Sequence, residues 1–182
     1  MQMDRGLDTG AVLQRREEAV GARDTTSTLG IRLASAGAEL LVQTLTGLEC
    51  RALRPIVQDD SLATPAPLLR REDGFAHWSE TALQLDRRVR AYDPWPPVIC
   101  LGPKGVLRLV AVEPLTATAP QETPPGTVLS REGQTITVAA GERTVLALHR
   151  VLPAGGREID AVAALAGGSL VLGAVLGDGS RT

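Results

Sequence analysis

One aspartate near the start of the chain is placed to present a carboxylate. Asp8 lies in the stretch Gly6-Leu7-Asp8-Thr9-Gly10, where a glycine on each side lets the backbone turn sharply. A carboxylate held on such a turn can orient a partner side chain or take part in proton transfer. It can also simply cap its own turn, which is the more common role in so short a motif. A functional role for Asp8 therefore depends on the rest of the sequence.

A set of basic residues is the second group that could do chemistry. Arg87 and Arg90 share one face of a predicted helix at i,i+3, and Arg88 points elsewhere. Such side chains can contact nucleic-acid phosphates, which supply most sequence-independent affinity. The alternative is a solvated helix face on which Asp86 pairs with Arg90 at i,i+4. Weaker candidates for phosphate contacts, in the predicted barrel, are Lys104, Arg108 and Arg150.

The histidines and cysteines favour structural roles. His77 and His149 have no second metal ligand nearby in the sequence, and Cys50 and Cys100 are too far apart to form a metal-type pair. Neither cysteine has a neighbouring base that would make it a nucleophile. We therefore expect structural thiols in a reducing cytoplasm, and no bound metal.

The composition allows a packed core of small aliphatic residues. Apolar residues make up 43% of the 182 residues, but only one Phe, one Tyr and two Trp are present. Trp78 and Trp95 could stack on bases, but with so few aromatics we expect both to pack at the junction of a helix and a sheet. The net charge of −2 argues against a strong free-standing nucleic-acid binder. No apolar run long enough to span a membrane and no secretory signal are visible, so we expect a cytoplasmic monomer with no membrane partner.

The first third of the chain is predicted to be mixed α/β. Two short extended pieces, 10–14 and 17–20, precede a long helix over 24–49 with Asp24 as its N-cap. Apolar residues recur along this helix at helical spacing, and nothing nearby in the chain is large enough to cover them. This indicates that the body of a domain is missing. The stripe consists of Leu29, Leu33, Ala36, Leu40, Leu41, Leu45 and Leu48.

A connector and a second helix follow. Prolines interrupt residues 51–69, which rules out regular structure there. The second helix is predicted over 79–91, with Ser79 as its N-cap. Its buried stripe is Ala82, Leu85 and Val89.

The rest of the chain has the period-two pattern of strands. Turn signals containing glycine separate short segments rich in β-branched residues and leucine, which is typical of a small antiparallel barrel. A longer loop is expected over 116–125 and a short helix over 160–165. The predicted strands are 98–101, 106–112, 126–130, 135–139 and 143–151.

Several of these motifs together resemble the methionyl-tRNA formyltransferase family. In that family an acidic-Gly step leads to Asp-Trp-Ser and then to a basic helix that ends in Arg-Ala-Phe-Asn-Pro-Trp-Pro. The segment 1–10 resembles the stretch that carries the family's catalytic aspartate, so the resemblance covers essentially the whole chain. The other matching segments are 71–74, 77–79, 86–96, 119–129 and 152–155.

The sequence departs from the family pattern at a few positions. His77 stands where the family usually has Asp, Asp93 where it has Asn, and Pro97 where it has Gly. Pro65 replaces an aromatic residue in the connector. The order and spacing of the motifs are nevertheless preserved.

The resemblance implies a two-domain enzyme. Its N-terminal domain is Rossmann-like and binds 10-formyltetrahydrofolate, and its C-terminal domain is an OB-like antiparallel β-barrel that helps to hold initiator methionyl-tRNA. By the same resemblance, residues 1–53 are a remnant of the catalytic domain (a hairpin and a helix), 54–69 a linker and 70–182 the OB-like domain. The family's Asn and His stabilise the developing oxyanion, while its Asp, matched by Asp8, orients the His and assists proton transfer.

The chain lacks the other two members of that catalytic set. It contains no asparagine, and Phe75 and Ala147 stand two residues before its two histidines. The folate-binding Ser-Leu-Leu-Pro motif is also absent. We therefore expect a truncated chain that binds no folate and is inactive alone. In an alternative, it complements a separately encoded N-terminal half.

Two other functions are compatible with the same residues. The barrel could serve as a non-catalytic tRNA-binding module. It could also be the C-terminal domain of a formyltransferase that acts on a nucleotide sugar. The Asp-Pro-Trp-Pro junction at 93–96 and the basic helix favour the tRNA enzyme.

Overall fold

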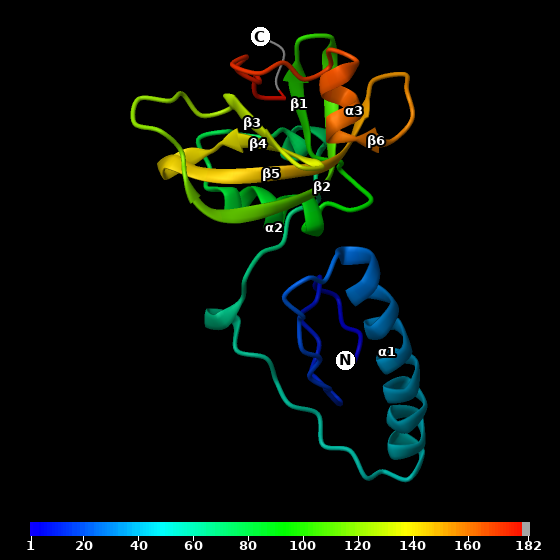
Figure 1. The fold of residues 1–182 in the computed structure, drawn as a ribbon. Helices are drawn as coiled ribbons and strands as arrows, with labels where there is room; N and C mark the ends of the chain where they lie inside the picture. The colour runs from blue at the N-terminus through cyan, green and yellow to red at the C-terminus, as the bar shows by residue number, and fades with distance from the viewer. Residues whose placement is uncertain (180–182) are drawn as a thin grey trace. The chain divides into compact units, whose positions relative to one another are not determined.

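Residues 1–179 are described by a computed structural model, in which the chain divides into two units, Met1–Leu68 and Leu69–Thr182. The first unit contains one long helix, α1 (Thr26–Glu49), and the second contains a curved antiparallel sheet with two short helices (Figure 1). None of the helices in the described residues has the length and apolar composition needed to cross a membrane.

Helix α1 begins one residue later than the sequence indicates. Thr25 is its N-cap: the Thr25 hydroxyl accepts a hydrogen bond from the N–H of Thr28, and the Thr28 hydroxyl accepts one from the N–H of Thr25. This reciprocal capping box satisfies two backbone donors that a helix start leaves open. The prediction of Asp24 as N-cap is wrong, because the Asp24 carboxylate binds Arg32 and the N–H of Gly21 instead.

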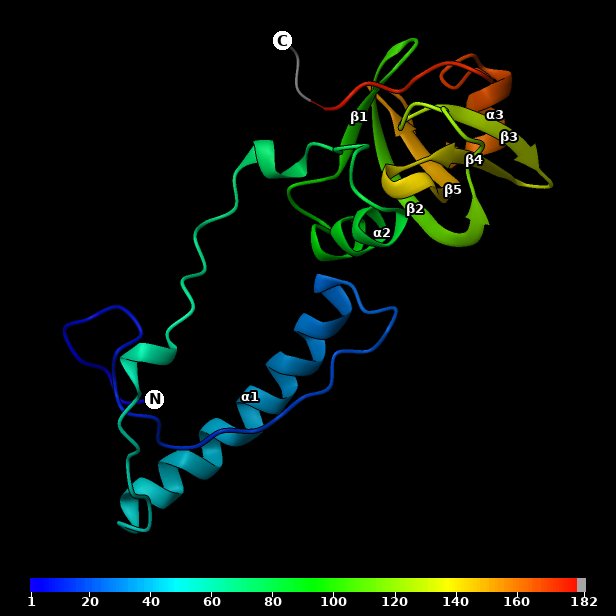
Figure 2. The ribbon, with the colours of Figure 1, turned by 90° about the vertical axis from the view of Figure 1, so that its left-hand side faces the viewer.

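The predicted N-terminal hairpin is also wrong. Residues before α1 form no strand, and Val12 instead pairs with Ile56 through reciprocal N–H···O bonds of 2.8 and 2.9 Å. The extended segment between Val12 and α1 runs beside the helix (Figure 2). Polar side chains hold it there, with a Thr44–Gln14 hydrogen bond of 2.7 Å and an Arg16–Glu39 ion pair of 2.7 Å.

Most of the large apolar residues of α1 are exposed, whereas Leu29 and Leu40 are half-buried. No residue of the helix is buried in the described structure, although helices of this length normally owe their stability to packing of an apolar face. Six large apolar side chains are exposed, namely Ile31, Leu33, Leu41, Val42, Leu45 and Leu48. We call this set the exposed α1 face.

The second unit is built on a six-stranded sheet in which every named pair is antiparallel. The strand order is β1-β2-β5-β4-β3. Strand β6 lies outside this order and pairs with the C-terminal end of β5. Strands β4 and β5 supply much of the core, including Ile136, Leu146 and Leu148, which are all fully buried. The strands are β1 (Ile99–Gly102), β2 (Gly105–Thr118), β3 (Val128–Glu132), β4 (Thr135–Ala139), β5 (Thr144–Pro153) and β6 (Ile159–Asp160).

Two helices accompany this sheet. Helix α2 (Ala82–Ala91) packs on β2 and β5, and buries the predicted stripe of Ala82, Leu85 and Val89. Its N-cap is Thr81, not Ser79, because the Thr81 hydroxyl accepts from the N–H of Gln84 and the Gln84 side chain accepts in return. Helix α3 (Ala161–Ala166) packs against β5, and corresponds to the short helix expected at 160–165.

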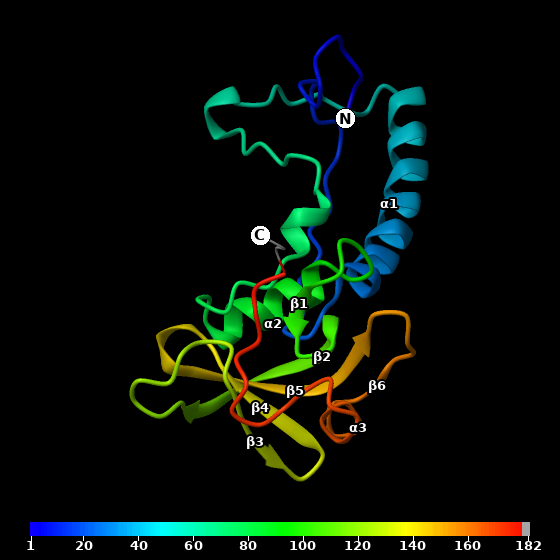
Figure 3. The same cartoon turned by 90° about the horizontal axis from the view of Figure 1, so that it is seen from above.

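The sheet is not a closed barrel. Its ladder ends at β1 on one side and β3 on the other. The C-terminal segment Ala174–Gly177, drawn in red, lies between these two edges (Figures 1 and 3). Gly177 exchanges both backbone hydrogen bonds with Leu101 of β1, and Val128 of β3 donates to Ala174 at 2.9 Å. An isolated bridge also joins Thr127 to Val175.

Candidate functional site

Asp8 sits in a loop whose backbone is tightly fixed. The N–H of Gln2 donates to the carbonyl of Ala11 at 2.8 Å, which closes the base of the loop. Inside the loop, the Asp4 carboxylate accepts from the Thr9 hydroxyl and the Gly6 N–H, and these bonds hold the pKa of Asp4 below its ordinary value. Asp8 itself has φ of 57°, in the left-handed region that Asp tolerates better than most residues. Its carboxylate is therefore presented from a defined turn, as the two flanking glycines predict.

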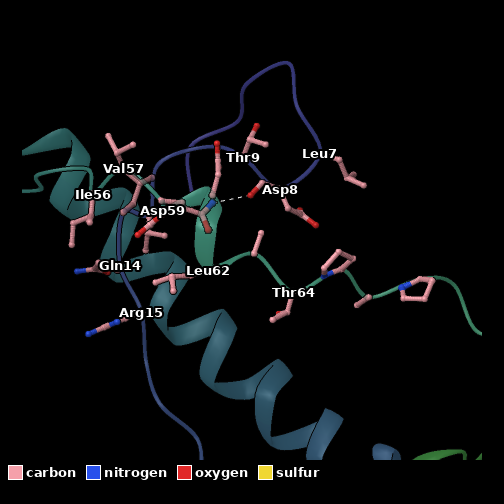
Figure 4. Close-up of a pocket in the computed structure, with 18 residues that line it drawn as sticks. Leu7, Asp8, Thr9, Gln14, Arg15, Ile56, Val57, Asp59, Leu62 and Thr64 are labelled. Atoms are coloured by element: carbon pink, nitrogen blue, oxygen red, sulfur yellow. Dashed lines mark hydrogen bonds between the residues drawn. The ribbon is translucent and has the colours of Figure 1, made fainter.

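Next to this loop lies a pocket with a volume of about 970 Å³, which residues of the loop and of the connector line together. Figure 4 shows Leu7, Asp8 and Thr9 on one side of it and connector residues such as Leu62 and Thr64 on the other. No histidine and no asparagine is among its lining residues. The lining therefore lacks the two residue types that the family resemblance pairs with Asp8.

Two of the predicted phosphate-binding arginines are engaged within the fold. Arg88 donates to the carbonyl of Phe75 at 2.9 Å and to the Glu80 carboxylate. Arg90 donates to Asp86, which is only 3% exposed, at 3.0 Å. This confirms the i,i+4 pair. Arg88 joins the residues before α2 to the helix, whereas the Arg90–Asp86 pair lies within α2.

The strand candidates also have partners. Arg108 lies 3.6 Å from Asp93, and Arg150 lies 2.8 Å from Glu158. Lys104 donates to the carbonyl of Gly167 at 2.6 Å, at the C-terminal end of α3, where a cation is favoured by the helix dipole. Of the six predicted basic residues, only Arg87 is exposed and makes no hydrogen bond or ion pair within residues 1–179.

The two tryptophans differ. Trp78 is 2% exposed and belongs to the core, as predicted. Trp95 is 54% exposed, so the expectation that it packs in the core is wrong in this chain. Its neighbours Pro94 and Pro96 fix the backbone of the loop after α2.

Each histidine lies near a carboxylate, and the two cysteines differ in exposure. His77 lies 3.5 Å from Asp178 and His149 lies 3.3 Å from Glu113, both half-exposed. Cys100 is buried in β1, and burial raises the pKa of its thiol to about 12. Cys50 is exposed. No group of three metal-ligating side chains gathers in the described part of the chain.

A family model and the fold agree on the class of this chain. The model described as formyl transferase, C-terminal domain, matches residues 68–169, which is nearly the whole of the second unit. The chain therefore belongs to the formyltransferase family through its C-terminal domain.

The names of the curated relatives are more specific than the family model, because they include the substrate. A methionyl-tRNA formyltransferase of Solibacter usitatus is 40% identical over 179 residues, which is 98% of this chain and 56% of that protein. One from Anaeromyxobacter dehalogenans is 38% identical over 151 residues, 83% of this chain and 48% of that protein. The chain thus spans about half the length of these relatives.

Solved structures share the fold. A HypX variant from Aquifex aeolicus superposes with a TM-score of 0.63 at 15% identity, over 89% of this chain and 29% of HypX. HypX in complex with tetrahydrofolic acid gives a TM-score of 0.62 at 14% identity, over 89% of this chain and 28% of that one. At this identity the likeness concerns the fold alone.

One residue that contacts the Asp8 turn could not be identified from the sequence. Gln58 of the connector donates from Nε2 to the carbonyls of Asp8 and Gly10, both at 2.8 Å. The sequence predicts only a polar turn at this position. Since the partners are 50 and 48 residues away, no local pattern points to these bonds.

Proposed function

We propose that this chain is the C-terminal part of a methionyl-tRNA formyltransferase. In this proposal it contributes to transfer of the formyl group of 10-formyltetrahydrofolate to the amino group of initiator methionyl-tRNA. The observation that carries the proposal is 40% identity to a protein of that name along 98% of the chain. The Asp8 turn and the Asp-Pro-Trp-Pro junction at 93–96 support it from the residues themselves.

Asp8 is the proposed catalytic contribution of the first unit. In the complete site it would orient a histidine and assist proton transfer, with an asparagine completing the set. Because this chain contains no asparagine and neither of its histidines lies in an Asn-x-His sequence, we propose that the two partners of Asp8 and the folate-binding residues come from a further polypeptide segment. The exposed α1 face is the apolar surface that such a segment would cover, and this supports the proposal.

The second unit is the proposed tRNA-binding part. We infer an OB-like barrel in which the C-terminal segment Ala174–Gly177 bridges the two edges of the sheet through its bonds to β1 and β3. Arg87 is the proposed phosphate contact, because its guanidinium is exposed and not engaged by any described residue. The boundaries proposed for catalytic remnant, linker and barrel remain 1–53, 54–69 and 70–182.

Formylation in the presence and absence of a complementing half tests this function. The half is the part of the Solibacter usitatus relative that precedes the region matched by this chain. We expect the 182-residue chain alone to leave methionyl-tRNA unformylated, and the chain joined to that half to formylate it with 10-formyltetrahydrofolate as donor. Formylation by the chain alone, or none by the joined protein while the intact Solibacter enzyme is active, would overturn the proposal. A nucleotide-sugar amine offered in parallel distinguishes the related class of formyltransferase.

A non-catalytic tRNA-binding module is the second candidate, favoured by the separate core of the second unit. In that case the chain alone binds initiator tRNA with an affinity that falls steeply as salt rises, and the joined protein gains no activity. No tRNA binding at low salt would exclude it.

A further inference from the structure

The loop that carries Asp8 depends on one side chain from the connector. A glutamine amide has two N–H donors, and Gln58 directs Nε2 at two backbone oxygens, those of Asp8 and Gly10, at 2.8 Å each. Both distances are those of well-formed N–H···O bonds. The dashed line in Figure 4 marks the bond to Asp8, whose carboxylate points away from it.

The approach of Gln58 to the loop is set by the backbone. The reciprocal bonds between Val12 and Ile56 lie two residues beyond Gly10 in one segment and two residues before Gln58 in the other. In an antiparallel pair this register puts Gln58 opposite Gly10. The glutamine therefore reaches its acceptors from a fixed backbone position.

The other contacts of the loop do not reach the Asp8 peptide. The Gln2–Ala11 bond fixes the base, and the Asp4 carboxylate binds Gly6 and Thr9 inside the loop. Gly10 is confined because a Cβ there would overlap the carbonyl oxygen of Gln2. Among the described residues, Gln58 alone donates to the carbonyl of Asp8, whose left-handed φ of 57° is a conformation that needs support.

We propose that Gln58 is the positioning residue for the Asp8 carboxylate. The inference rests on the proposed function, in which Asp8 assists proton transfer. Gln58 has no part in the chemistry itself: it holds the Asp8–Gly10 turn, and through it the direction in which the carboxylate leaves the backbone. Reacting groups must be held in a near-attack geometry, and a misplacement of about 1 Å can cost on the order of 100-fold in rate.

The hold on the turn is tested on the 182-residue chain itself. Gln58→Leu removes both donors, and Gln58→Glu keeps the length while replacing the donors with an acceptor-only carboxylate at neutral pH. The matched control is Gln43→Leu, since Gln43 is exposed on α1 and its side chain makes no hydrogen bond within residues 1–179. The probes are the ¹³C shifts of the Asp8 and Gly10 carbonyl carbons and amide exchange at Thr9 and Ala11.

We expect both Gln58 variants to shift these two carbonyls and to speed exchange at the following amides, with the Val12–Ile56 bridge intact and the control unchanged. Carbonyl shifts in Gln58→Glu that match the parent chain would overturn the proposal, because they would mean that the amide donors do not hold the turn. If Gln58→Leu also loses the Val12–Ile56 bridge, its carbonyl shifts no longer report the missing donors alone. The Gln58→Glu variant then decides the question, because it keeps a polar side chain.

The effect on chemistry is measured in the joined protein described above. We expect Gln58→Glu to lower kcat for formylation by about 10-fold or more, with KM for methionyl-tRNA and for the formyl donor nearly unchanged. A role limited to folding would instead lower the amount of active protein and leave kcat per active site as it was, which would overturn the positioning role. An inactive parent protein would count against the proposed function only, because the carbonyl shifts of the chain still decide whether Gln58 holds Asp8.

Discussion

The backbone of Gly141 lies directly against that of Ser79: a Cβ at Gly141 would overlap the carbonyl oxygen of Ser79. The N–H of Gly141 also donates to the carbonyl of Glu80 at 2.7 Å. This contact ties the turn before β5 to the segment that leads into α2. It requires glycine because backbone atoms, which cannot swing aside, occupy the space.

Gly141→Ala should therefore destabilise the second unit. Overpacking of this kind typically costs about 1–3 kcal/mol, and we expect the unfolding midpoint in urea to fall accordingly. Tryptophan fluorescence is a suitable probe because Trp78 and Trp95 both lie in the second unit. The control is Gly30→Ala in α1, where a Cβ meets nothing within 4 Å: it should raise helicity and leave the tryptophan transition in place. Equal midpoints for parent and Gly141→Ala would contradict the contact.

The start of α1 should depend on the ionisation of Asp24. Hydrogen bonds from Arg32 and from the Gly21 N–H hold the pKa of Asp24 well below its ordinary value of 3.8. A group with a lowered folded-state pKa stabilises the fold above its unfolded pKa, and that contribution is lost as the pH falls through the folded value. We expect the helical circular dichroism of the parent chain to begin falling below pH of about 4.

Asp24→Asn should remove part of that fall and start from lower helicity at neutral pH. Asp60→Asn is the matched control, because Asp60 is exposed and the ion pairs of Arg32 are with Glu18 and Asp24. Superimposable acid profiles for the parent and Asp24→Asn would show that this carboxylate does not support the helix start.

Arg87 and Arg88 should separate binding from stability. Arg87 is exposed, so Arg87→Ala should leave stability within about 0.5 kcal/mol and lower the slope of log affinity for tRNA against log salt by about 1. Arg88→Ala removes the donor to Phe75 and to the Glu80 carboxylate, which should cost about 1–3 kcal/mol of stability. Filter binding over a salt series and urea unfolding check the two. An unchanged salt slope in Arg87→Ala would remove Arg87 from the tRNA interface.

The two cysteines should react very differently with a thiol reagent. Cys50 is exposed, whereas burial raises the pKa of Cys100 to about 12. Since the thiolate is the nucleophile, we expect one thiol to react in the folded chain and both to react in denaturant. Cys50→Ser should abolish the fast reaction. Rapid labelling of Cys100 in the folded Cys50→Ser variant would mean that β1 opens readily.

Local chemistry in the sequence accounts for the parts of the fold that were predicted well. The alternation in Thr135–Ala139 gave β4 its bounds, and the helical spacing of Ala82, Leu85 and Val89 identified the buried face of α2. Strand β2 runs to Thr118, beyond the predicted end at Val112, and Pro114 pairs with Leu146 of β5 in regular register. Strand β1 pairs with β2 only up to Arg108, so Pro114 lies where one side of β2 is an edge, and an edge tolerates the missing N–H of proline.

Features that depend on distant partners could not be predicted. Three of the predicted phosphate-binding arginines form ion pairs instead. Their partners are Glu80, Asp93 and Glu158, which only the fold brings near them. Likewise, the sequence identifies Asp8 through its glycines and its family resemblance, but not Gln58. The prediction that Trp95 packs at the junction of a helix and a sheet is wrong, because an apolar ring predicts burial but does not say which residues would bury it.

The bridging of β1 and β3 by Ala174–Gly177 has a consequence for synthesis on the ribosome. Chain growth delivers β1 to β5 before the residues that pair with both sheet edges. Until then, the backbone groups of β1 and β3 that await Gly177 and Ala174 stay open, and open edges invite pairing with other chains. The second unit can therefore complete its native pairing only after translation of its last segment, so a nascent chain that stalls shortly before Ala174 is the species most exposed to aggregation.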